Sequence, residues 1–164
     1  MKVLVTGAAG FIGYHLCKAL LCRGDEVCGV DIVNDYYDPG LKKGRLADLG
    51  IVCDNETGIY LSRSEKYTSF EFSRTDIADF EGFLKLWAAF RPEAVVNLAA
   101  QPGVRYSLEN PWAYIKANVD GFLNVLECCR QMPVKHLVYA SSSSVYGDNA
   151  KVPFDEDDEV KDQA

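Results

Sequence analysis

Short apolar runs alternate with segments of helical periodicity along the whole chain. Five such runs predict buried strands, at residues 3–5, 26–30, 69–72, 94–100 and 135–140, the fourth of them fully buried. Apolar positions at helical spacing predict the connecting helices, over residues 10–23, 41–48, 80–90 and 111–130. Parallel strands need crossover connections, and such connections are right-handed. The pattern therefore predicts a single-domain α/β fold, a doubly wound parallel sheet of strand order 3-2-1-4-5 covered on both faces.

The first strand ends in a glycine-rich turn that opens the first helix, Thr6-Gly7-Ala8-Ala9-Gly10-Phe11-Ile12-Gly13. Gly7 permits the turn, Gly10 lets the backbone approach a bulky ligand, and Gly13 lets the helix press against the strand. The free N–H groups and the dipole of the first helical turn suit a pyrophosphate. This arrangement is typical of a Rossmann-type dinucleotide site, whereas an ordinary glycine-rich turn is the plainer alternative.

The second predicted strand ends at Asp31. A carboxylate at this place can accept both hydroxyls of an adenosine ribose, and it would repel a 2′-phosphate. No arginine or lysine sits immediately beside Asp31 in the sequence, so a 2′-phosphate would meet no compensating base. We therefore expect NAD rather than NADP as the cofactor, the alternative being a solvated aspartate at a strand end.

Further positions along the predicted carboxyl edge of the sheet could contact the same cofactor. Asn34 could reach the adenosine or serve as a turn residue, and the two are equally supported. Asp76 and Ile77 follow the third strand and would flank the adenine, while small residues after the fourth strand leave space for the cofactor. Asn118, in mid-helix, is either exposed or bonded across the helix face. The complete set of expected cofactor contacts is Gly7, Gly10, Phe11, Ile12, Gly13, Asp31, Asn34, Asp76, Ile77, Leu98, Ala99, Ala100 and Asn118.

Composition narrows the class of partner. The 164 residues carry a net charge of −7 without a Lys/Arg cluster, which argues against nucleic acids and anionic membranes as partners. No apolar run approaches the roughly 18 residues of a membrane span, and the N-terminus has no signal pattern, so we expect a cytoplasmic protein. Residues 50–67 are expected to form a surface excursion, in the form of an irregular hairpin.

The six cysteines lack the spacing of a metal or disulfide framework, because no C-x-x-C pair is present and only two histidines accompany them. We expect free thiols and no metal site. Residues 155–162 are strongly acidic and are expected to be solvated.

These motifs together resemble the extended short-chain dehydrogenase/reductases that act on nucleotide sugars. The resemblance rests on the glycine-rich turn, Asp31, Asp76-Ile77, residues 97–100 and residues 141–147, all in order. Residues 34–38, 101–107 and the four-serine run before Val145-Tyr146-Gly147 are most similar to UDP-glucuronate 4-epimerases. The resemblance implies an NAD-binding domain over residues 1–150. It also implies that residues 151–164 form an acidic linker toward a C-terminal catalytic and substrate-binding part outside this chain.

The same resemblance implies a hidden redox cycle on a UDP-sugar, in which NAD takes hydride from C4 and returns it to the other face. Ser142 would contact the reacting oxygen, with Ser143 and Ser144 as nearby hydrogen bonders, although a polar strand end capping a turn is the plainer interpretation. We suggest that Arg105 reaches the substrate's carboxylate or diphosphate, while a surface arginine is as well supported. The helix over residues 111–130 would form a homodimer seam.

The family's base is a tyrosine with a lysine four residues later, expected a couple of dozen residues after the serines. The one such pair in this sequence is Tyr14 with Lys18, on the first helix, which we interpret as coincidence. We therefore expect this chain by itself not to epimerise UDP-sugars. Two alternatives remain: an NAD-binding protein without catalysis, and a 4,6-dehydratase, whose acidic pair is replaced here by Ser143 and Ser144.

Overall fold

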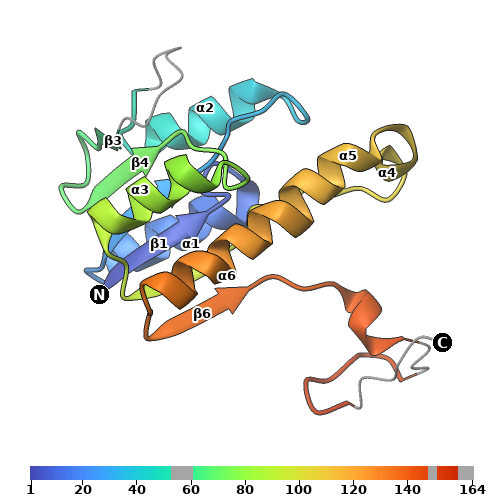
Figure 1. The fold of residues 1–164 in the computed structure, drawn as a ribbon. Coiled ribbons are helices and arrows are strands. Elements are labelled where there is room, and N and C mark those ends of the chain that lie inside the picture. The colour runs from blue at the N-terminus through green and yellow to red at the C-terminus, as the bar shows by residue number, and fades with distance from the viewer. Residues whose placement is uncertain (53–60, 148–150, 159–164) are drawn as a thin grey trace.

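The computed structural model describes residues 1–52, 61–147 and 151–158, which form a six-stranded sheet with helices on both faces (Figure 1). The strands are β1 (Lys2–Thr6), β2 (Glu26–Val30), β3 (Leu61–Arg63), β4 (Phe70–Ser73), β5 (Ala94–Asn97) and β6 (His136–Tyr139). The helices are α1 (Phe11–Cys22), α2 (Pro39–Asp48), α3 (Phe80–Phe90), α4 (Tyr106–Glu109), α5 (Pro111–Tyr114), a π-helical segment (Ile115–Asp120), α6 (Gly121–Gln131) and a 3₁₀ turn (Ser143–Tyr146). Every predicted strand and helix is present.

The strand order is β3-β4-β2-β1-β5-β6. Its five parallel strands follow the predicted order 3-2-1-4-5, and a sixth, β3, extends the sheet by pairing antiparallel with β4. The prediction missed this strand because β3 is three residues long, exposed at both ends and without an apolar pattern. The rest of the expected excursion, including residues 54–58, lies largely outside the described residues.

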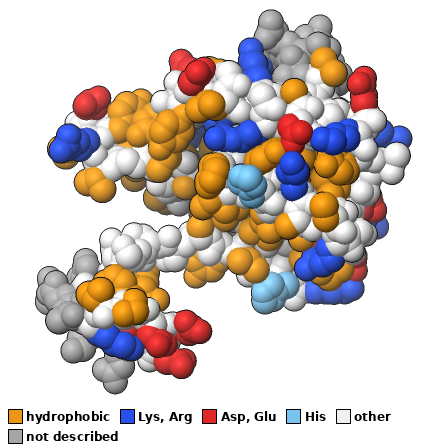
Figure 2. Space-filling model, turned by 180° about the vertical axis from the view of Figure 1, so that it is seen from behind, with side chains coloured by type: hydrophobic (Ala, Val, Ile, Leu, Met, Phe, Trp, Pro, Cys, Tyr) orange, Lys and Arg blue, Asp and Glu red, His pale blue; other side chains and the backbone are white. Residues whose placement is uncertain are grey.

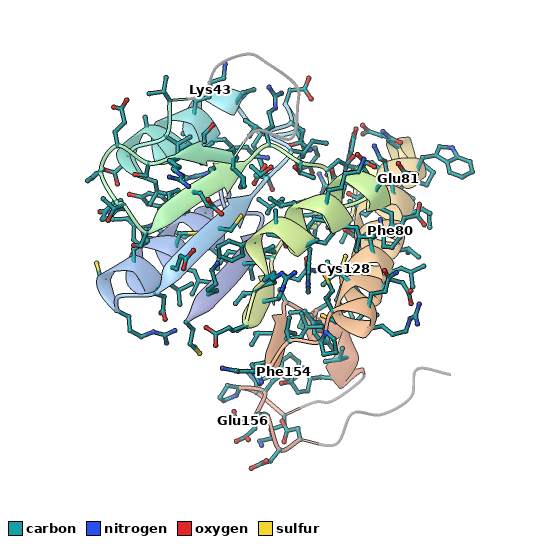
Figure 3. All side chains as sticks on the ribbon, turned by 60° about the vertical axis from the view of Figure 1, so that its left-hand side comes forward. Lys43, Phe80, Glu81, Cys128, Phe154 and Glu156 are labelled. Atoms are coloured by element: carbon teal, nitrogen blue, oxygen red, sulfur yellow. The ribbon has the colours of Figure 1, made fainter. Side chains whose placement is uncertain are left out.

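Two buried clusters hold the helices to the sheet, because successive strand residues point to opposite faces. Val3 and Val5 of β1 face α1 and α2, where the buried partners include Cys17, Leu20, Leu21 and Leu46. Leu4, between them, faces α3 and α6, where the buried partners include Phe83, Leu86, Trp87, Val125 and Cys128. Cys128 lies between α3 and α6 in Figure 3. This packing fixes the carboxyl ends of β1, β2 and β5 at one edge.

The predicted long helix is one continuous helical stretch with a wider segment in its middle. Asn110 caps its start by accepting a hydrogen bond from the Ala113 N–H at 3.3 Å, and Pro111 occupies the first turn, as predicted. Residues Ile115–Asp120 then adopt π-helical geometry before α6 continues. The stretch extends past the carboxyl edge of the sheet (Figure 1).

The expectation of a sheet covered on both faces is wrong at the β6 end. Val138 and Tyr139 of β6 are 46% and 54% exposed, and Val96 of β5 is only partly buried. The predicted full burial of the fourth strand is therefore also wrong. The chain after β6 runs away from the sheet instead of packing on it, and Figure 2 shows this segment and the far end of the long helix as two separate arms.

Candidate functional site

The glycine-rich turn leaves no room for side chains at its three glycines. Gly7 has a φ of +69°, and a Cβ there would lie 2.9 Å from the backbone of Leu98 and Ala99. A Cβ at Gly10 would lie 3.0 Å from the Gly7 carbonyl oxygen, and a Cβ at Gly13 would collide with that oxygen. The turn predicted at Gly7 and the tight packing of α1 predicted at Gly13 therefore have a steric basis, whereas the close approach of a ligand at Gly10 stays a prediction.

The start of α1 is open. Gly10 is the N-cap and provides no side-chain hydrogen bond, and the first turn contains no acidic residue. The side chains of Phe11 and Ile12 are each 66% exposed and stand beside the first backbone N–H groups. A helix start with unsatisfied N–H groups and a positive dipole end fits a phosphate or pyrophosphate.

Asp31 lies beside this helix start and is 7% exposed. Its Oδ2 accepts a hydrogen bond from the Ala9 N–H at 3.2 Å, which ties the end of β2 to the glycine turn. Its Oδ1 accepts from the Val33 N–H at 2.7 Å and from Lys42 Nζ at 3.2 Å. The carboxylate is therefore fixed, with Oδ2 less occupied than Oδ1 and directed toward the glycine turn.

The expectation that Asp31 has no compensating base is wrong, because Lys42 donates a hydrogen bond to its carboxylate. The lysine is eleven residues further along the chain, and the loop after β2 folds back so that α2 brings its ammonium to the carboxylate. Lys42 Nζ also donates to Asn34 Oδ1 at 2.9 Å. Asn34 is thus part of the Asp31 cluster, on the side expected for the adenosine.

A buried threonine joins the ends of β1 and β5 beneath the glycine turn. Thr6 Oγ1 donates to Asn97 Oδ1 at 2.6 Å and accepts from the N–H groups of Leu98 and Ala99, both at 3.1 Å. No role was predicted for the side chains of Thr6 and Asn97, although a polar residue in an otherwise apolar buried strand signals such a network. Ala99 is half-buried and Ala100 exposed, so this edge presents small side chains beside the turn.

The two residues after β4 have different surroundings. Asp76 Oδ2 forms an ion pair with Lys116 at 2.8 Å, and Oδ1 accepts from the Ala78 N–H at 2.9 Å. Ile77 is buried against α6, and a Cβ at Gly121 would lie 2.8 Å from its side chain. The Ile77 side chain packs in the core, and a cofactor contact by either residue stays a prediction.

Asn118 bonds across the helix face, the second of the two alternatives left open by the sequence. Its Oδ1 accepts from the Gln101 N–H at 2.8 Å, and its Nδ2 donates to the Gln101 carbonyl at 3.1 Å. Gln101, the first residue of the 101–107 segment, is 8% exposed, and its pairing with Asn118 was not predicted. Asn118 lies in the π-helical segment, a geometry that is frequent at functional sites. The pair holds the loop after β5 against the long helix.

Three tyrosines, which we call the aromatic bridge (Tyr36, Tyr106 and Tyr114), connect the loops after β2 and β5. The ring centroids of Tyr36 and Tyr106 are 5.0 Å apart, and those of Tyr106 and Tyr114 are 6.2 Å apart. The Tyr114 hydroxyl donates to the carbonyls of Pro102, at 2.9 Å, and Gly103. Desolvation, followed by the proximity of Tyr36, raises the pKa of Tyr114. Because β1 lies between β2 and β5, the bridge joins two segments that leave the sheet on either side of β1.

The serines lie apart from this cluster, on the arm that follows β6 (Figure 1). Ser142, Ser143 and Ser144 are exposed, and Ser142 Oγ accepts from the Ser144 N–H at 3.3 Å. This is the turn-capping geometry of the plainer interpretation, and a catalytic role for Ser142 stays a prediction. Arg105 is likewise exposed, at the start of α4, and a substrate contact by this residue stays a prediction.

Tyr14 and Lys18 belong to a surface network on the α2 side of α1. The Tyr14 hydroxyl donates to Asp48 Oδ2 at 2.5 Å, and Lys18 Nζ donates to Tyr14 and Asp48 at 3.1 and 3.0 Å. Lys66 reaches Asp48 Oδ1 at 3.1 Å. These hydrogen bonds, with that from Tyr14 the largest contribution, hold the pKa of Asp48 well below its usual range. They favour a structural role for the pair.

Neither a metal cluster nor a membrane span is found in the described ranges. Within residues 1–52, 61–147 and 151–158, no group of three or more His, Cys, Asp or Glu side chains could hold a metal ion. No helix in the same ranges is long and apolar enough to cross a bilayer. The described cysteines are free thiols, and burial raises the pKa of Cys17 to about 12, while Cys53 lies outside the described residues.

Comparison with known proteins also points to a nucleotide-sugar epimerase family that uses NAD. The profile of the NAD dependent epimerase/dehydratase family matches residues 3–163. Protein CapI of Staphylococcus aureus is 45% identical over 98% of this chain, and UDP-glucuronate 4-epimerase 4 of Arabidopsis thaliana is 47% identical over 98%. The chain spans only 43% and 33% of the lengths of these two relatives.

Solved structures share the fold. The UDP-glucuronic acid 4-epimerase of Bacillus cereus, in complex with UDP-glucuronic acid and NAD, matches with a TM-score of 0.73 and 35% identity, over 92% of this chain and 43% of that one. The UDP-Glc/GlcNAc 4-epimerase of Campylobacter jejuni matches with a TM-score of 0.76 and 26% identity, over 98% of this chain and 43% of that one.

Proposed function

Because the chain belongs to the NAD-dependent epimerase/dehydratase family, we propose that it is the cofactor-binding portion of a nucleotide-sugar 4-epimerase of the UDP-glucuronate type. The observation that carries the proposal is the steric cradle at Gly7, Gly10 and Gly13 beneath an open helix start, with Asp31 fixed beside it. The named relatives of UDP-glucuronate type, at 44–47% identity, support this sugar over others.

Different residues of the cradle bind different parts of the dinucleotide. The N–H groups at the start of α1 receive the pyrophosphate, and Asp31 Oδ2 receives a ribose hydroxyl. NAD, when bound, supplies reversible hydride transfer at the sugar carbon being inverted. The hydrogen bonds of Thr6 and of Asn118 both hold the segment after β5 that flanks this space, so that this side of the cradle needs little rearrangement.

Substrate contacts belong to the loops and the arm beyond the cradle. Arg105 offers a planar guanidinium for a diphosphate or carboxylate, and Ser142, with Ser143 and Ser144 beside it, offers a hydroxyl for the reacting oxygen. We further propose that the whole protein is cytoplasmic and forms a homodimer through the long helix. The roles proposed for Arg105 and the three serines rest on the family resemblance and on the exposure of their side chains.

Binding of NADH to the chain, measured by calorimetry, tests the proposal. We expect Gly10→Ala to weaken the binding of NADH at least tenfold, or about 1.4 kcal/mol. The added methyl group would lie 3.0 Å from the Gly7 carbonyl oxygen, so the turn that receives the pyrophosphate has to shift. Gly44→Ala on α2 is the matched control, since a Cβ there meets nothing within 4 Å. Equal NADH affinity in the two variants would contradict the proposed cradle.

A turnover assay separates the enzyme from the two alternatives. We expect the 164-residue chain to bind NAD without converting UDP-glucuronate to UDP-galacturonate, because Tyr14 and Lys18 are engaged with Asp48 and Ser142 lies apart from the cradle. Turnover near the usual enzyme range of about 1 per second or more would show that the base has been misplaced. A 4-keto-6-deoxy product would favour the dehydratase.

A further inference from the structure

The ion pair between Lys42 and Asp31 is almost entirely removed from solvent. The side chains are 11% and 6% exposed, with Nζ 3.2 Å from Oδ1. Lysine is rarely buried to this degree unless it has a specific partner, and the pair stands beside the open start of α1. The sequence predicted the carboxylate of this site without its counter-ion.

The hydrogen bonds of Asp31 leave its two oxygens unequal. Oδ1 already accepts from Val33 and Lys42, whereas Oδ2 accepts only from Ala9 among the described residues. A carboxylate offers about four acceptor positions in all, so one ribose hydroxyl fits at Oδ2 without displacing a protein donor. The ammonium of Lys42 occupies the side of the carboxylate where the second hydroxyl would bind.

We propose that Lys42 is a determinant of dinucleotide specificity. Its ammonium places a positive charge at the 2′ position of the adenosine ribose and thereby reduces the difference in affinity between NAD and NADP. The inference rests on the proposed binding of the dinucleotide at Asp31. A group attached to the 2′ oxygen lies within contact of the carboxylate and therefore within reach of an ammonium 3.2 Å from it. Lys42 cancels the repulsion that a lone carboxylate would exert, and it donates to a 2′-phosphate directly.

Arg45 supplies a second cation from the same helix. It follows Lys42 at the i+3 position, so both side chains leave α2 on one face. Its Nη1 donates to the Ala9 carbonyl at 3.1 Å, and its guanidinium lies 5.9 Å from the Phe11 ring centroid. The glycine turn is thus bordered by two cations and one carboxylate, an arrangement that does not exclude an additional phosphate.

The test is the ratio of the dissociation constants of NADPH and NADH, measured by fluorescence titration of the whole chain. We expect Lys42→Met to raise this ratio at least tenfold, or about 1.4 kcal/mol, mainly through weaker NADPH binding. NADH affinity should change by less than about threefold, or about 0.7 kcal/mol, because Oδ1 becomes free to accept the second hydroxyl.

Two further variants separate a local charge from other causes. Lys43→Met removes an equal charge from the neighbouring position, where the side chain is exposed and points away from the sheet (Figure 3), and it should leave the ratio unchanged. Lys42→Arg keeps the charge and should keep the ratio near that of the unmodified chain. Circular dichroism of each variant verifies that it is folded.

The possible outcomes are distinct. An unchanged ratio in Lys42→Met, or equal changes in Lys42→Met and Lys43→Met, would overturn the inference while leaving the proposed cofactor site intact. Failure of the unmodified chain to bind either dinucleotide would overturn both. A ratio that rises in Lys42→Met alone and is restored in Lys42→Arg supports the assignment.

Discussion

Thr6 shows how a single side chain organises the floor of the candidate site. Its hydroxyl is buried at the end of β1, and it satisfies two backbone donors of the segment after β5 while donating to Asn97. Segments more than ninety residues apart are joined by these three hydrogen bonds. The glycine turn therefore rests on a polar network inside an otherwise apolar core.

Replacing Thr6 by valine keeps the shape of the side chain and removes the network. We expect Thr6→Val to lower the free energy of unfolding by on the order of 2 kcal/mol, because buried donors and an acceptor lose their partner. Urea unfolding measures the change, with Thr68→Val, at an exposed position, as the control. A loss no larger than that of the control would show that solvent replaces the hydroxyl.

Local residues of the site were predictable and distant ones were not. The glycines and Asp31 could be identified because their roles follow from short-range rules about turns and strand ends. Lys42 could not, since its position depends on how the loop after β2 returns α2 to the sheet. Thr6, Asn97 and Gln101 were missed because their hydrogen bonds join different elements of the chain.

At the scale of elements, Asp48 connects the packing of α1 and α2 with the turn before β4. It accepts from Tyr14 and Lys18 of α1 and from Lys66, so one carboxylate at the end of α2 holds two neighbouring segments. The hydrogen bond that Lys18 donates to Tyr14, followed by the one that it donates to Asp48, raises the pKa of Lys18 above its usual range. The network is exposed, so its contribution to stability is screened by salt.

The lowered pKa of Asp48 predicts a pH dependence of stability. A carboxyl whose pKa is depressed by folding stabilises the native state above its unfolded value, about 3.9, and loses this contribution as pH falls below it. Urea midpoints should therefore be higher for the native chain than for Asp48→Asn at pH 7, with a difference that shrinks toward pH 3. Asp120→Asn, at an exposed position on the long helix, serves as control. A difference independent of pH would contradict the role of the charge.

Helices and strands were predicted closely where periodicity and caps agree. The bounds of α3 match the prediction, and α1 differs by a residue at each end. The π-helical segment was not predictable, because the apolar spacing of residues 111–130 fits an ordinary helix over its whole length. The short strand β3 depends on its pairing with β4 and carries no signal of its own.

At the scale of the whole molecule, apolar surface is concentrated on the long helix and at the β6 end of the sheet. Ile115, Val119, Leu123 and Leu126 follow one another at helical spacing and are between 41% and 54% exposed. Figure 2 shows hydrophobic side chains along the helical arm. An exposed apolar face of this kind fits the proposed homodimer seam.

Self-association through this face gives a direct prediction. We expect the chain to sediment as a dimer and Leu123→Glu to shift it toward the monomer, because a buried carboxylate at the seam would be desolvated without a partner. Leu108→Glu, at a position that is 87% exposed on α4, is the matched control. A monomer that binds no hydrophobic dye would contradict the proposed seam.

The order of the five parallel strands was predictable from the alternation of elements, because crossover handedness leaves few arrangements. The open face at β6 was not, since burial of a strand depends on which helices pack against it. Val138 and Tyr139 have the apolar character of core residues and yet lie at the surface. Apolar pattern predicts which residues avoid water, and it does not say which element covers them.

The aromatic bridge has a kinetic consequence for a ligand lodged along the carboxyl edge. Tyr36 lies in the loop after β2 and Tyr106 at the start of α4, in the segment after β5, and their rings are in contact. For a dinucleotide bound there as proposed, we expect entry and departure both to be slower while these rings are in contact, with little change in the equilibrium constant. Under the proposed function, we therefore expect these tyrosines to affect residence time more than affinity.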